Sequence, residues 1–154
     1  MTEENRVAVS RVGMEHTEQV APLFDAYRQF YEQPTDLAGA RDFIQQRLSR
    51  EESIVLLATW GEAAEPAGFV QLYPTFSSVS LEKRWILNDL FVSPEARRLG
   101  AGKLLLEEAR AFASSTGAGA LALETAVDNH AAQALYESLG WERKEGFYAY
   151  SLRL

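Results

Sequence analysis

Apolar residues recur along the chain with two spacings, which divide it into expected helices and strands. Intervals of three and four residues are typical of amphipathic helices, whereas short apolar runs bounded by glycine, proline or polar residues are typical of strands. The first spacing predicts helices over Thr17–Tyr31, Asp36–Ser49, Leu104–Ser115 and Ala131–Leu139. The second predicts strands over Val7–Val12, Ser53–Trp60, Ala67–Tyr73, Val79–Val92, Leu121–Val127, Glu142–Lys144 and Phe147–Leu152.

The order of these elements indicates a mixed sheet. Three successive strands predict antiparallel pairing, and the later strand–helix–strand unit predicts a parallel pair with a right-handed crossover. The last two strands are expected to form a hairpin through Glu145 and Gly146. We therefore expect an α/β (α+β) sandwich, in which a mostly antiparallel central sheet of about seven strands is flanked by about four helices.

Composition and charge narrow the function. The chain has 154 residues, which fits a single domain over residues 1–154. Its net charge of −7 argues against nucleic-acid binding, which needs a basic surface, and is compatible with a cationic substrate. The chain contains no cysteine, and its two histidines, His16 and His130, lack metal-ligand spacing, so no metal is expected. We also expect a cytoplasmic protein, because no membrane-spanning run and no apolar signal core occur.

A loop with two arginines and two glycines follows the apolar run that ends at Val92. Its pattern, R-x-x-G-x-G at Arg97, Gly100 and Gly102, stands before a predicted helix. Glycines let the backbone approach a diphosphate closely, and free N–H groups at a helix start attract negative charge. A Walker loop is excluded, because Arg97 stands where that loop needs glycine. A dinucleotide fingerprint is excluded, because Leu105 replaces its third glycine.

A second motif, N-H-A-A-Q-A-L-Y-E-S-L-G-W, follows at Asn129–Trp141. Together with W-I-L-N-D-L-F-V-S-P-E-A-R-R-L-G-A-G-K-L-L, which begins at Trp85, it resembles the GNAT superfamily of N-acetyltransferases. The resemblance covers Trp85–Trp141, and the order of the predicted elements agrees with the acetyltransferase (GNAT) fold. It implies an enzyme, an acetyl-CoA-dependent N-acetyltransferase. Such an enzyme transfers the acetyl group directly to a primary amine of a polyamine-like or amino-acid-like molecule, or of a lysine side chain.

The resemblance also implies which residues hold coenzyme A. The R-x-x-G-x-G loop resembles the family's pyrophosphate loop, and the strand before it resembles the pantetheine site, where unpaired backbone groups bind the cofactor like a substitute strand. The implied cofactor residues are Leu90, Phe91, Val92, Arg97, Arg98, Leu99, Gly100, Ala101, Gly102, Lys103, Asn129 and Tyr136. Asn129 is also a predicted helix N-cap. Tyr136 matches the family tyrosine that protonates the departing thiolate as general acid.

The general base stays open between two carboxylates. Many family members carry glutamate on the strand where this chain has Asn88, which cannot act as a base. Asp89 is adjacent and ionisable, and alternation places Asn88 and Asp89 on opposite faces unless a bulge intervenes. Glu124, expected on the next strand, is the other candidate, a water chain is a third route, and Asp89 can equally be structural. The resemblance also implies that Tyr31, Glu32 and Asn88 lie on the acceptor side of the site.

Two further expectations concern activity and assembly. A non-catalytic acyl-CoA-binding sensor or scaffold is the alternative function, because Asn88 replaces the glutamate. A homodimer is expected, because exposed strand edges and the hairpin at the end of the sequence offer pairing surfaces.

Overall fold

The computed structural model describes residues 6–154, which separate into two compact units. The first unit ends at Leu123, and the second begins at Glu124. The first unit contains one sheet whose strands stand side by side in chain order. These strands are β1 (Val7–Val12), β2 (Ile54–Trp60), β3 (Glu65–Ser77), β4 (Glu82–Val92) and β5 (Ala120–Ala122). Neighbouring strands are antiparallel except for β4 and β5, which run parallel.

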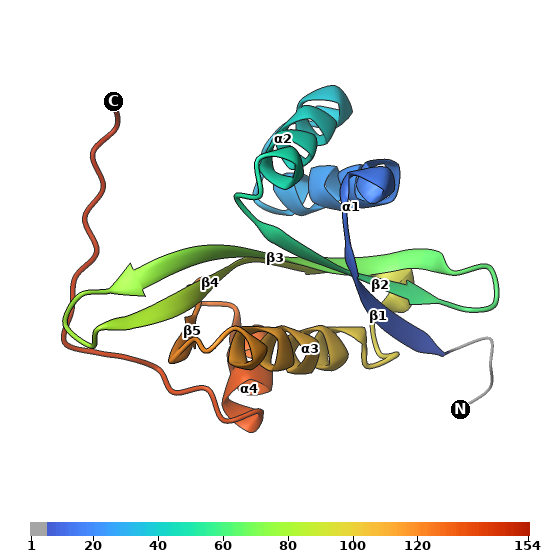
Figure 1. Cartoon of the computed structure of the whole chain (residues 1–154). Helices are drawn as coiled ribbons and strands as arrows, with labels where there is room; N and C mark the ends of the chain where they lie inside the picture. The colour runs from blue at the N-terminus through green and yellow to red at the C-terminus, as the bar shows by residue number, and fades with distance from the viewer. Residues whose placement is uncertain (1–5) are drawn as a thin grey trace. The chain divides into compact units, whose positions relative to one another are not determined.

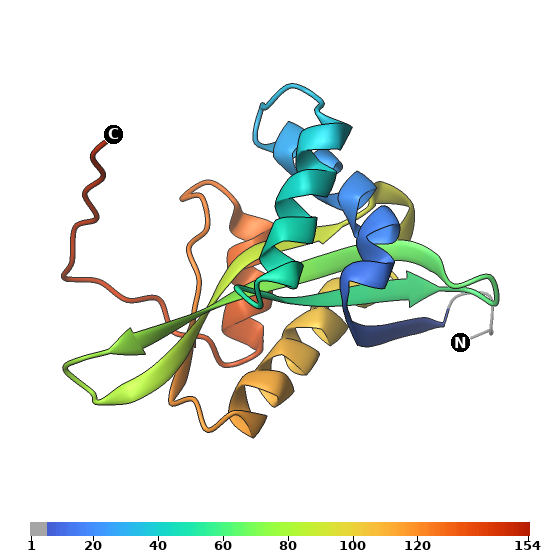
Figure 2. The same cartoon turned by 45° about the horizontal axis from the view of Figure 1, so that its top comes forward.

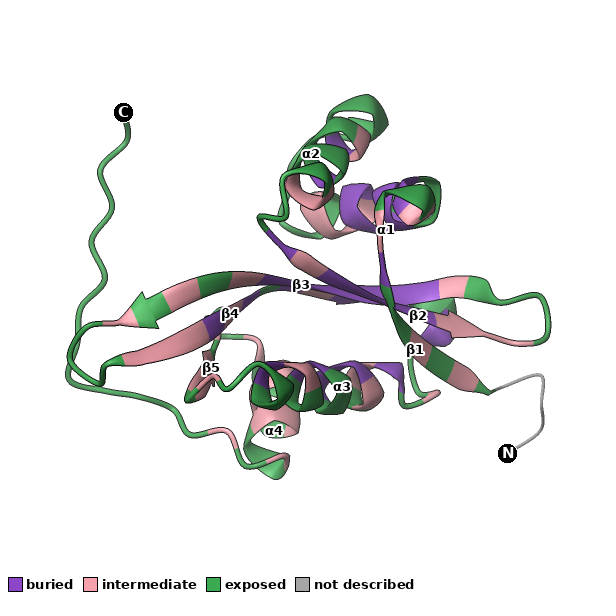
Figure 3. Ribbon diagram, viewed as in Figure 1, coloured by how far each residue is buried: buried purple, intermediate pink, exposed green. Residues whose placement is uncertain are grey.

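Helices cover both faces of this sheet (Figures 1 and 2). One face carries α1 (Thr17–Phe30) and α2 (Leu37–Ser49), and the other carries α3 (Ala101–Ser115). The buried side chains of α1 and α2 form a core with those of the first four strands, and Phe69 and Phe91 lie within it. On α3 the buried residues recur every three or four positions, and they lie on the side of the helix that faces the sheet (Figure 3).

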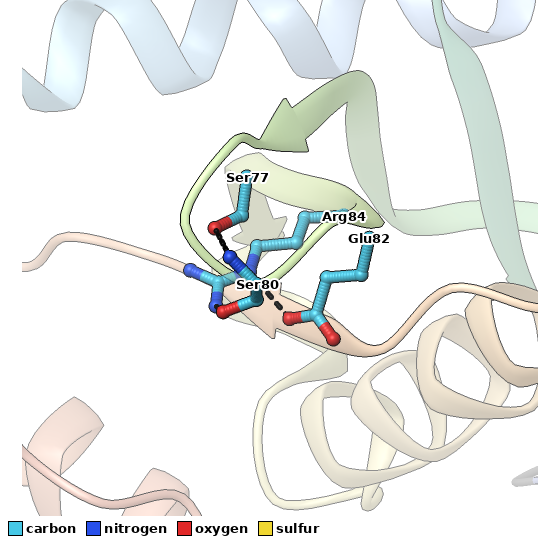
Figure 4. A network of polar contacts seen from close by, with 4 residues as sticks. All are labelled: Ser77, Ser80, Glu82 and Arg84. Atoms are coloured by element: carbon cyan, nitrogen blue, oxygen red, sulfur yellow. Dashed lines mark hydrogen bonds and ion pairs between the residues drawn. The ribbon is translucent and has the colours of Figure 1, made fainter.

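The turn between β3 and β4 is held by its own polar side chains (Figure 4). The Arg84 Nε donates to Glu82 Oε1 at 2.8 Å, and its guanidinium also donates to Ser80 Oγ at 3.2 Å. Glu82 lies so close to Gly119 that a Cβ there would overlap its carboxylate. The absence of a side chain at Gly119, together with its N–H bond to the Lys83 carbonyl at 2.9 Å, brings β5 against β4.

The predicted fold class is confirmed, but the strand count was wrong. Among residues 6–154 the sheet has five strands rather than about seven, with four α-helices. The predicted hairpin of Glu142–Lys144 and Phe147–Leu152 is absent, and both segments are exposed without regular structure. An isolated two-stranded hairpin is marginal in water. The three charged residues of Glu142–Lys144 give it no apolar face to bury.

Several element boundaries also differ from the predictions; the strand predicted from Val79, for example, begins at Glu82. The third strand does not stop before Pro74 but runs to Ser77. Proline is tolerated there because β2 pairs with β3 only as far as Leu72, so one edge of β3 is open beyond that point. The strand predicted over Leu121–Val127 covers only Ala120–Ala122. The helix predicted from Leu104 begins at Ala101, which places Gly102 in its first turn.

Asp25 fixes the connection between α1 and α2. Its side chain is buried and accepts hydrogen bonds from Thr35 Oγ1 at 2.6 Å and from the Asp36 N–H at 2.8 Å. These two bonds, the Thr35 bond first, hold the pKa of the Asp25 carboxyl below its ordinary value. Asp36 in turn caps α2 by accepting from the Gly39 N–H. The end of α1, where Tyr31 lies, is therefore anchored.

Replacing Asp25 by alanine is expected to lower the free energy of unfolding by about 1–3 kcal/mol at pH 7, because two donors lose their buried acceptor. A lowered folded-state pKa stabilises the fold above the unfolded value of about 3.9, and this contribution is lost as the pH falls through the folded-state pKa. Urea unfolding at pH 7 and at about pH 3 measures the effect. Asp42→Ala, an exposed change on α2, is the control. Equal stabilities of Asp25→Ala and Asp42→Ala at pH 7 would contradict the prediction.

The second unit contains α4 (His130–Ser138). The predicted N-cap is confirmed, because Asn129 Oδ1 accepts from the Ala132 N–H at 3.2 Å. Gly140 follows the helix with a left-handed φ of 92°, the conformation that glycine favours at the end of a helix. Among residues 6–154, no helix combines the length and the apolar character needed to cross a bilayer.

Candidate active site

A β-bulge at Asn88 decides which way the end of β4 faces. Gln71 on β3 pairs with Asp89, but the next residue, Leu72, pairs with Leu87, so Asn88 is an extra residue on β4. Before the bulge, the Trp85 ring contacts Phe112 of α3 at 5.1 Å. Strict alternation would send residues 87, 89 and 91 to that same face. The bulge reverses the order, and Asp89 faces α1 and α2 instead.

The Phe91 ring supports this assignment. It lies 6.5 Å from the ring of Tyr27, which belongs to α1 on the opposite face of the sheet from α3. Asn88 and Asp89 were expected to lie on opposite faces unless a bulge intervened, and the structure has such a bulge. The bulge leaves the Asn88 side chain exposed and turns the Asp89 carboxylate into the interior.

Asp89 is a buried carboxylate held by two amides. Its exposed fraction is 4%, and Gln71 Nε2 donates to its Oδ2 at 2.6 Å, while Asn88 Nδ2 donates to its Oδ1 at 3.1 Å. Burial raises the pKa of Asp89, and the hydrogen bonds from Gln71 and Asn88 oppose that rise. No arginine, lysine or histidine contributes to this pKa shift. A buried carboxylate with a raised pKa is a stronger proton acceptor than an exposed one, so Asp89 is suited to act as a base.

Tyrosines connect Asp89 with the surface. The Tyr27 hydroxyl donates to the Asn88 carbonyl at 3.3 Å, and the Tyr27 ring contacts Tyr31 at 5.1 Å. Burial, and after it the charge of Asp89, raises the pKa of Tyr27, so its hydroxyl stays a donor. The same two causes raise the pKa of Tyr73 to about 12. Tyr31 is 48% exposed. We call Tyr27, Tyr31, Gln71, Asn88 and Asp89 the Asp89 cluster.

The glycine loop presents unpaired N–H groups at the start of α3. Ser93 follows β4, a short 3-10 turn covers Pro94–Ala96, and Gly100 stands before α3 with a left-handed φ of 79°. A Cβ at Gly100 would meet no atom within 4 Å, so glycine is favoured there by conformation alone. Among the described residues, no backbone acceptor is found for the N–H groups of Arg98, Gly100, Ala101, Gly102 and Lys103. These N–H groups form a site suited to an anion.

The basic side chains of the loop differ in their surroundings. The Arg97 Nε donates to the Val92 carbonyl at 3.3 Å, so its guanidinium is turned back toward the strand. Arg98 is exposed and has a positive φ of 73°. Lys103 is exposed in the first turn of α3. The structure therefore brings the predicted loop residues together around one helix start.

One edge of β4 is open beside the loop. β5 pairs with β4 only over Arg84–Ile86, so Leu87–Val92 have no strand partner on that side among the described residues. The Ser93 N–H donates to the Ala67 carbonyl of the β3 edge at 2.8 Å. By alternation, the backbone groups of Leu90 and Val92 point to the open edge. Gly68 lets β3 approach β4 here, since a Cβ would lie 2.5 Å from the Phe91 carbonyl oxygen.

The remaining predicted residues have other surroundings. Glu32 is exposed at the end of α1 with a positive φ of 63°. Glu124 does not lie on a strand, because β5 ends at Ala122, and its side chain is exposed. In the second unit, Asn129 caps α4, and the partly buried Tyr136 ring lies 6.0 Å from the Trp141 ring.

Two members of the Asp89 cluster were missed in the sequence. Tyr27 lies within the predicted helix Thr17–Tyr31, and a buried tyrosine needs a partner for its hydroxyl, which could have drawn attention to it. Gln71 is the single strongly polar residue within the run G-F-V-Q-L-Y, and it is fully buried. A polar residue in a buried apolar run is informative, because its burial costs free energy unless it is hydrogen-bonded.

Comparisons with known proteins agree on one family. Residues 20–141 match the model of the acetyltransferase (GNAT) family. The chain is 50% identical over 135 residues to the uncharacterized N-acetyltransferase YhfO of Bacillus subtilis, covering 88% of this chain and 89% of that protein. It is 32% identical over 137 residues to a probable acetyltransferase of Haemophilus influenzae, covering 88% and 91% of the two chains.

A solved structure shows the same fold. The crystal structure of a probable acetyltransferase has a TM-score of 0.89 and 41% identity, over 96% of this chain and 97% of that chain. An aminoglycoside N-acetyltransferase, AAC(6')-Iy, in complex with CoA has a TM-score of 0.78 at 18% identity, over 97% of this chain and 96% of that chain. The second likeness concerns the fold alone.

Proposed function

The chain belongs to the acetyltransferase (GNAT) family and is an N-acetyltransferase, and on that premise we propose that acetyl-CoA is its acetyl donor. The acetyl group passes directly to a primary amine of a polyamine-like or amino-acid-like small molecule, or of a lysine side chain.

We further propose that residues 1–154 act as a single domain in the cytoplasm. The family match over residues 20–141 supports one domain, since it crosses the boundary between the two units. The lack of cysteine fits a reducing compartment.

The residues of the loop fit the diphosphate of coenzyme A. No backbone acceptor is found among the described residues for the N–H groups of Arg98, Gly100, Ala101, Gly102 and Lys103, and the start of α3 favours negative charge. Arg98 and Lys103 add exposed positive charge. The open edge at Leu90 and Val92 fits the amide groups of pantetheine, which would bind as an added strand. The proposal rests mainly on one observation: the N–H groups at the start of α3 and the open edge of β4 lie next to Asp89, a buried carboxylate on β4.

The Asp89 cluster supplies the acceptor chemistry. When bound, acetyl-CoA supplies a thioester carbonyl as electrophile, and the amine must be neutral to attack it. Asp89 accepts the proton from the amine nitrogen, with Gln71 and Asn88 fixing the orientation of the carboxylate. The rings of Tyr27 and Tyr31 suit a cationic amine before it loses that proton. Gln71 Oε1 is buried and has no donor among the described residues, so an N–H of the amine would satisfy it.

Isothermal titration with acetyl-CoA tests the proposed donor. Binding is expected to require the diphosphate, so coenzyme A should bind as well, and pantetheine more weakly. If millimolar acetyl-CoA gives no heat of binding, the proposal is wrong.

Tyr136 is the proposed donor of the proton to the departing thiolate. A phenol with an ordinary pKa of about 10 can protonate a thiolate, and such general acid help contributes about 10²–10⁴-fold in rate. Replacing Tyr136 by phenylalanine is expected to lower kcat far more than it raises the KM for acetyl-CoA. Steady-state kinetics with acetyl-CoA varied measure both constants. A kcat that stays within about twofold of the wild type would show that this hydroxyl is unnecessary.

Gln71→Leu is expected to shift the pH profile of the reaction. The Gln71 hydrogen bond stabilises the ionised Asp89, so its loss raises the pKa of that carboxyl further. A base must be ionised, so the acidic limb of kcat/KM moves to higher pH. The midpoint of that limb, measured between about pH 5 and 9, is the readout. Gln45→Leu, an exposed change on α2, should leave the midpoint in place. An unchanged midpoint in Gln71→Leu would argue against Asp89 as the titrating base.

A further inference from the structure

A second group of polar side chains lies on the same face of the sheet as the Asp89 carboxylate. The ladder with β4 uses every residue of β3 from Gln71 to Tyr73, so the side chains of these two residues point to the same face. That face is the one covered by α1 and α2, because Gln71 binds Asp89 there. Tyr73 is partly buried, and β3 and β4 continue past α2 on this face (Figure 2).

Ser53 has a buried hydroxyl without a partner. Ile54 pairs with Leu72, so one further step of the same register places Ser53 opposite Tyr73. Ser53 is 6% exposed, and its Oγ has no hydrogen-bond partner among residues 6–154. Burying a hydroxyl without a hydrogen bond costs free energy, so an unsatisfied one marks a place where a polar atom of a ligand is expected.

Arg47 brings positive charge to the same place. It lies in the last turn of α2, and its Nε is 3.4 Å from Oε1 of Glu52, the residue that precedes Ser53. Its guanidinium carbon lies 4.6 Å from the centre of the Phe43 ring, and the side chain is largely buried. A guanidinium has five N–H donors, and the ion pair with Glu52 involves Nε, so donors at its outer end remain for a ligand.

Tyr73 stands between this charge and Asp89. Burial and the charge of Asp89 raise the pKa of Tyr73 to about 12, and the charge of Arg47 opposes them, so both charged groups act on one hydroxyl. The hydroxyl therefore stays protonated near neutral pH and can donate a hydrogen bond.

We propose, on the premise of the proposed function, that Arg47, Ser53 and Tyr73 form a subsite for a carboxylate of the acceptor, the carboxylate subsite. All three side chains present donors, and an ionised carboxylate is purely an acceptor. Arginine binds carboxylates through its planar fork of N–H groups. A second ammonium group, as in a polyamine, would meet the charge of Arg47, whose partner Glu52 is already paired. The acceptor is therefore an amino acid rather than a polyamine.

The spacing selects the amine that reacts. Gln71, which holds Asp89, and Tyr73 are two residues apart on one strand, which is about 6.8 Å. An extended chain spans roughly 1.2 Å per bond, so about six bonds separate the reacting nitrogen from the carboxylate. The ω-amine of lysine or of 6-aminohexanoate matches this length, whereas an α-amine lies too close to its own carboxylate. The acceptor class is an ω-amino acid that reacts at its distal amine.

Three amines of similar length test this preference: 6-aminohexanoate, hexylamine and 1,6-diaminohexane. With acetyl-CoA, kcat/KM is expected to be roughly 10- to 100-fold higher for 6-aminohexanoate, because this amine alone has a carboxylate to accept charge-assisted hydrogen bonds. Equal kcat/KM values for the three amines would overturn the carboxylate subsite. A preference for 1,6-diaminohexane would also overturn it, and would indicate a polyamine site.

Binding separates the subsite from the proposed function. The same amines are titrated into the protein saturated with coenzyme A, where no acetyl transfer occurs. Tighter binding of 6-aminohexanoate, without turnover when acetyl-CoA is supplied, would contradict the proposed function and support the subsite. Equal binding of the three amines, with turnover, would do the reverse. No binding of 6-aminohexanoate would overturn the subsite, whichever other amines react.

Substitutions connect the preference with the residues. Arg47→Gln is expected to bring the kcat/KM ratio of 6-aminohexanoate to hexylamine toward one, mainly through KM. Ser53→Ala should lower the same ratio without loss of stability in urea, because it removes a hydroxyl that the fold leaves unsatisfied. Arg50→Gln removes an exposed charge just after α2 and should keep the wild-type ratio. A wild-type ratio in both Arg47→Gln and Ser53→Ala would overturn the subsite.

Discussion

Replacing Asp89 by asparagine is expected to lower kcat for amine acetylation by about 10²–10⁴-fold, the usual contribution of a positioned general base. The change removes the proton acceptor but little else. Asparagine has nearly the same shape, and the Gln71 amide can turn its unpartnered Oε1 toward the new N–H groups. The variant should be at least as stable as the wild type at pH 7, because a buried charge has been removed.

Glu124→Gln is the matched control, since Glu124 is the other candidate base. It is exposed and lies beyond the end of β5, so its kcat should stay near that of the wild type. Steady-state kinetics for both variants at saturating acetyl-CoA decide between the two carboxylates. A large loss in Glu124→Gln with normal activity in Asp89→Asn would reverse the assignment. Normal activity in both would leave water as the proton acceptor.

The second large effect is expected at the glycine loop. Replacing Arg98 and Lys103 together by alanine should raise the Kd for coenzyme A by about 100-fold or more, because each charge-assisted hydrogen bond contributes about 1.5–3 kcal/mol and 1.4 kcal/mol is tenfold. Both side chains are exposed, so the fold should be unaffected. Isothermal titration measures the change. Arg110→Ala removes a positive charge from an exposed position later on α3 and should bind normally.

Dephospho-coenzyme A shows which phosphate the loop binds, because it keeps the diphosphate but lacks the phosphate on the ribose. The same relative loss of affinity is expected for both ligands in the double variant. If the loss disappears with dephospho-coenzyme A, the two side chains contact the ribose phosphate, and the diphosphate assignment is wrong. An unchanged Kd for both ligands would contradict a role for this charge altogether.

The fold was largely predictable from the sequence, because local periodicity determines most of it. The helix over Thr17–Phe30 and the strand over Ile54–Trp60 were predicted within one residue at each end. The errors occur where the pairing of strands, rather than the local periodicity of the sequence, sets the ends of an element. Pro74 would interrupt a strand only if both edges of that strand were paired. The length of β5 is set by the extent of its pairing with β4, which covers Arg84–Ile86. The segment 142–154 has the pattern of a strand but no partner within the described residues.

The candidate site was predictable only in part. The loop was found because glycines and arginines at fixed spacing have a local physical meaning. The face of the sheet on which the Asp89 side chain lies could not be predicted. That face depends on a bulge, and the bulge depends on the register of β3 and β4, which the sequence does not give. Gln71 stands 18 residues from Asp89 in the chain, so their contact depends on the pairing of β3 with β4.

The central claim is that this chain moves an acetyl group from acetyl-CoA to an amine. The direct test supplies acetyl-CoA with an isotope-labelled acetyl group together with polyamines, amino acids, aminoglycosides or lysine peptides, and follows free thiol and labelled amine by mass spectrometry. We expect at least one class of amine to gain the label in amounts equal to the thiol released, and Asp89→Asn to slow both. Acetyl-CoA that binds but stays intact with every amine would contradict the claim and favour an acyl-CoA sensor.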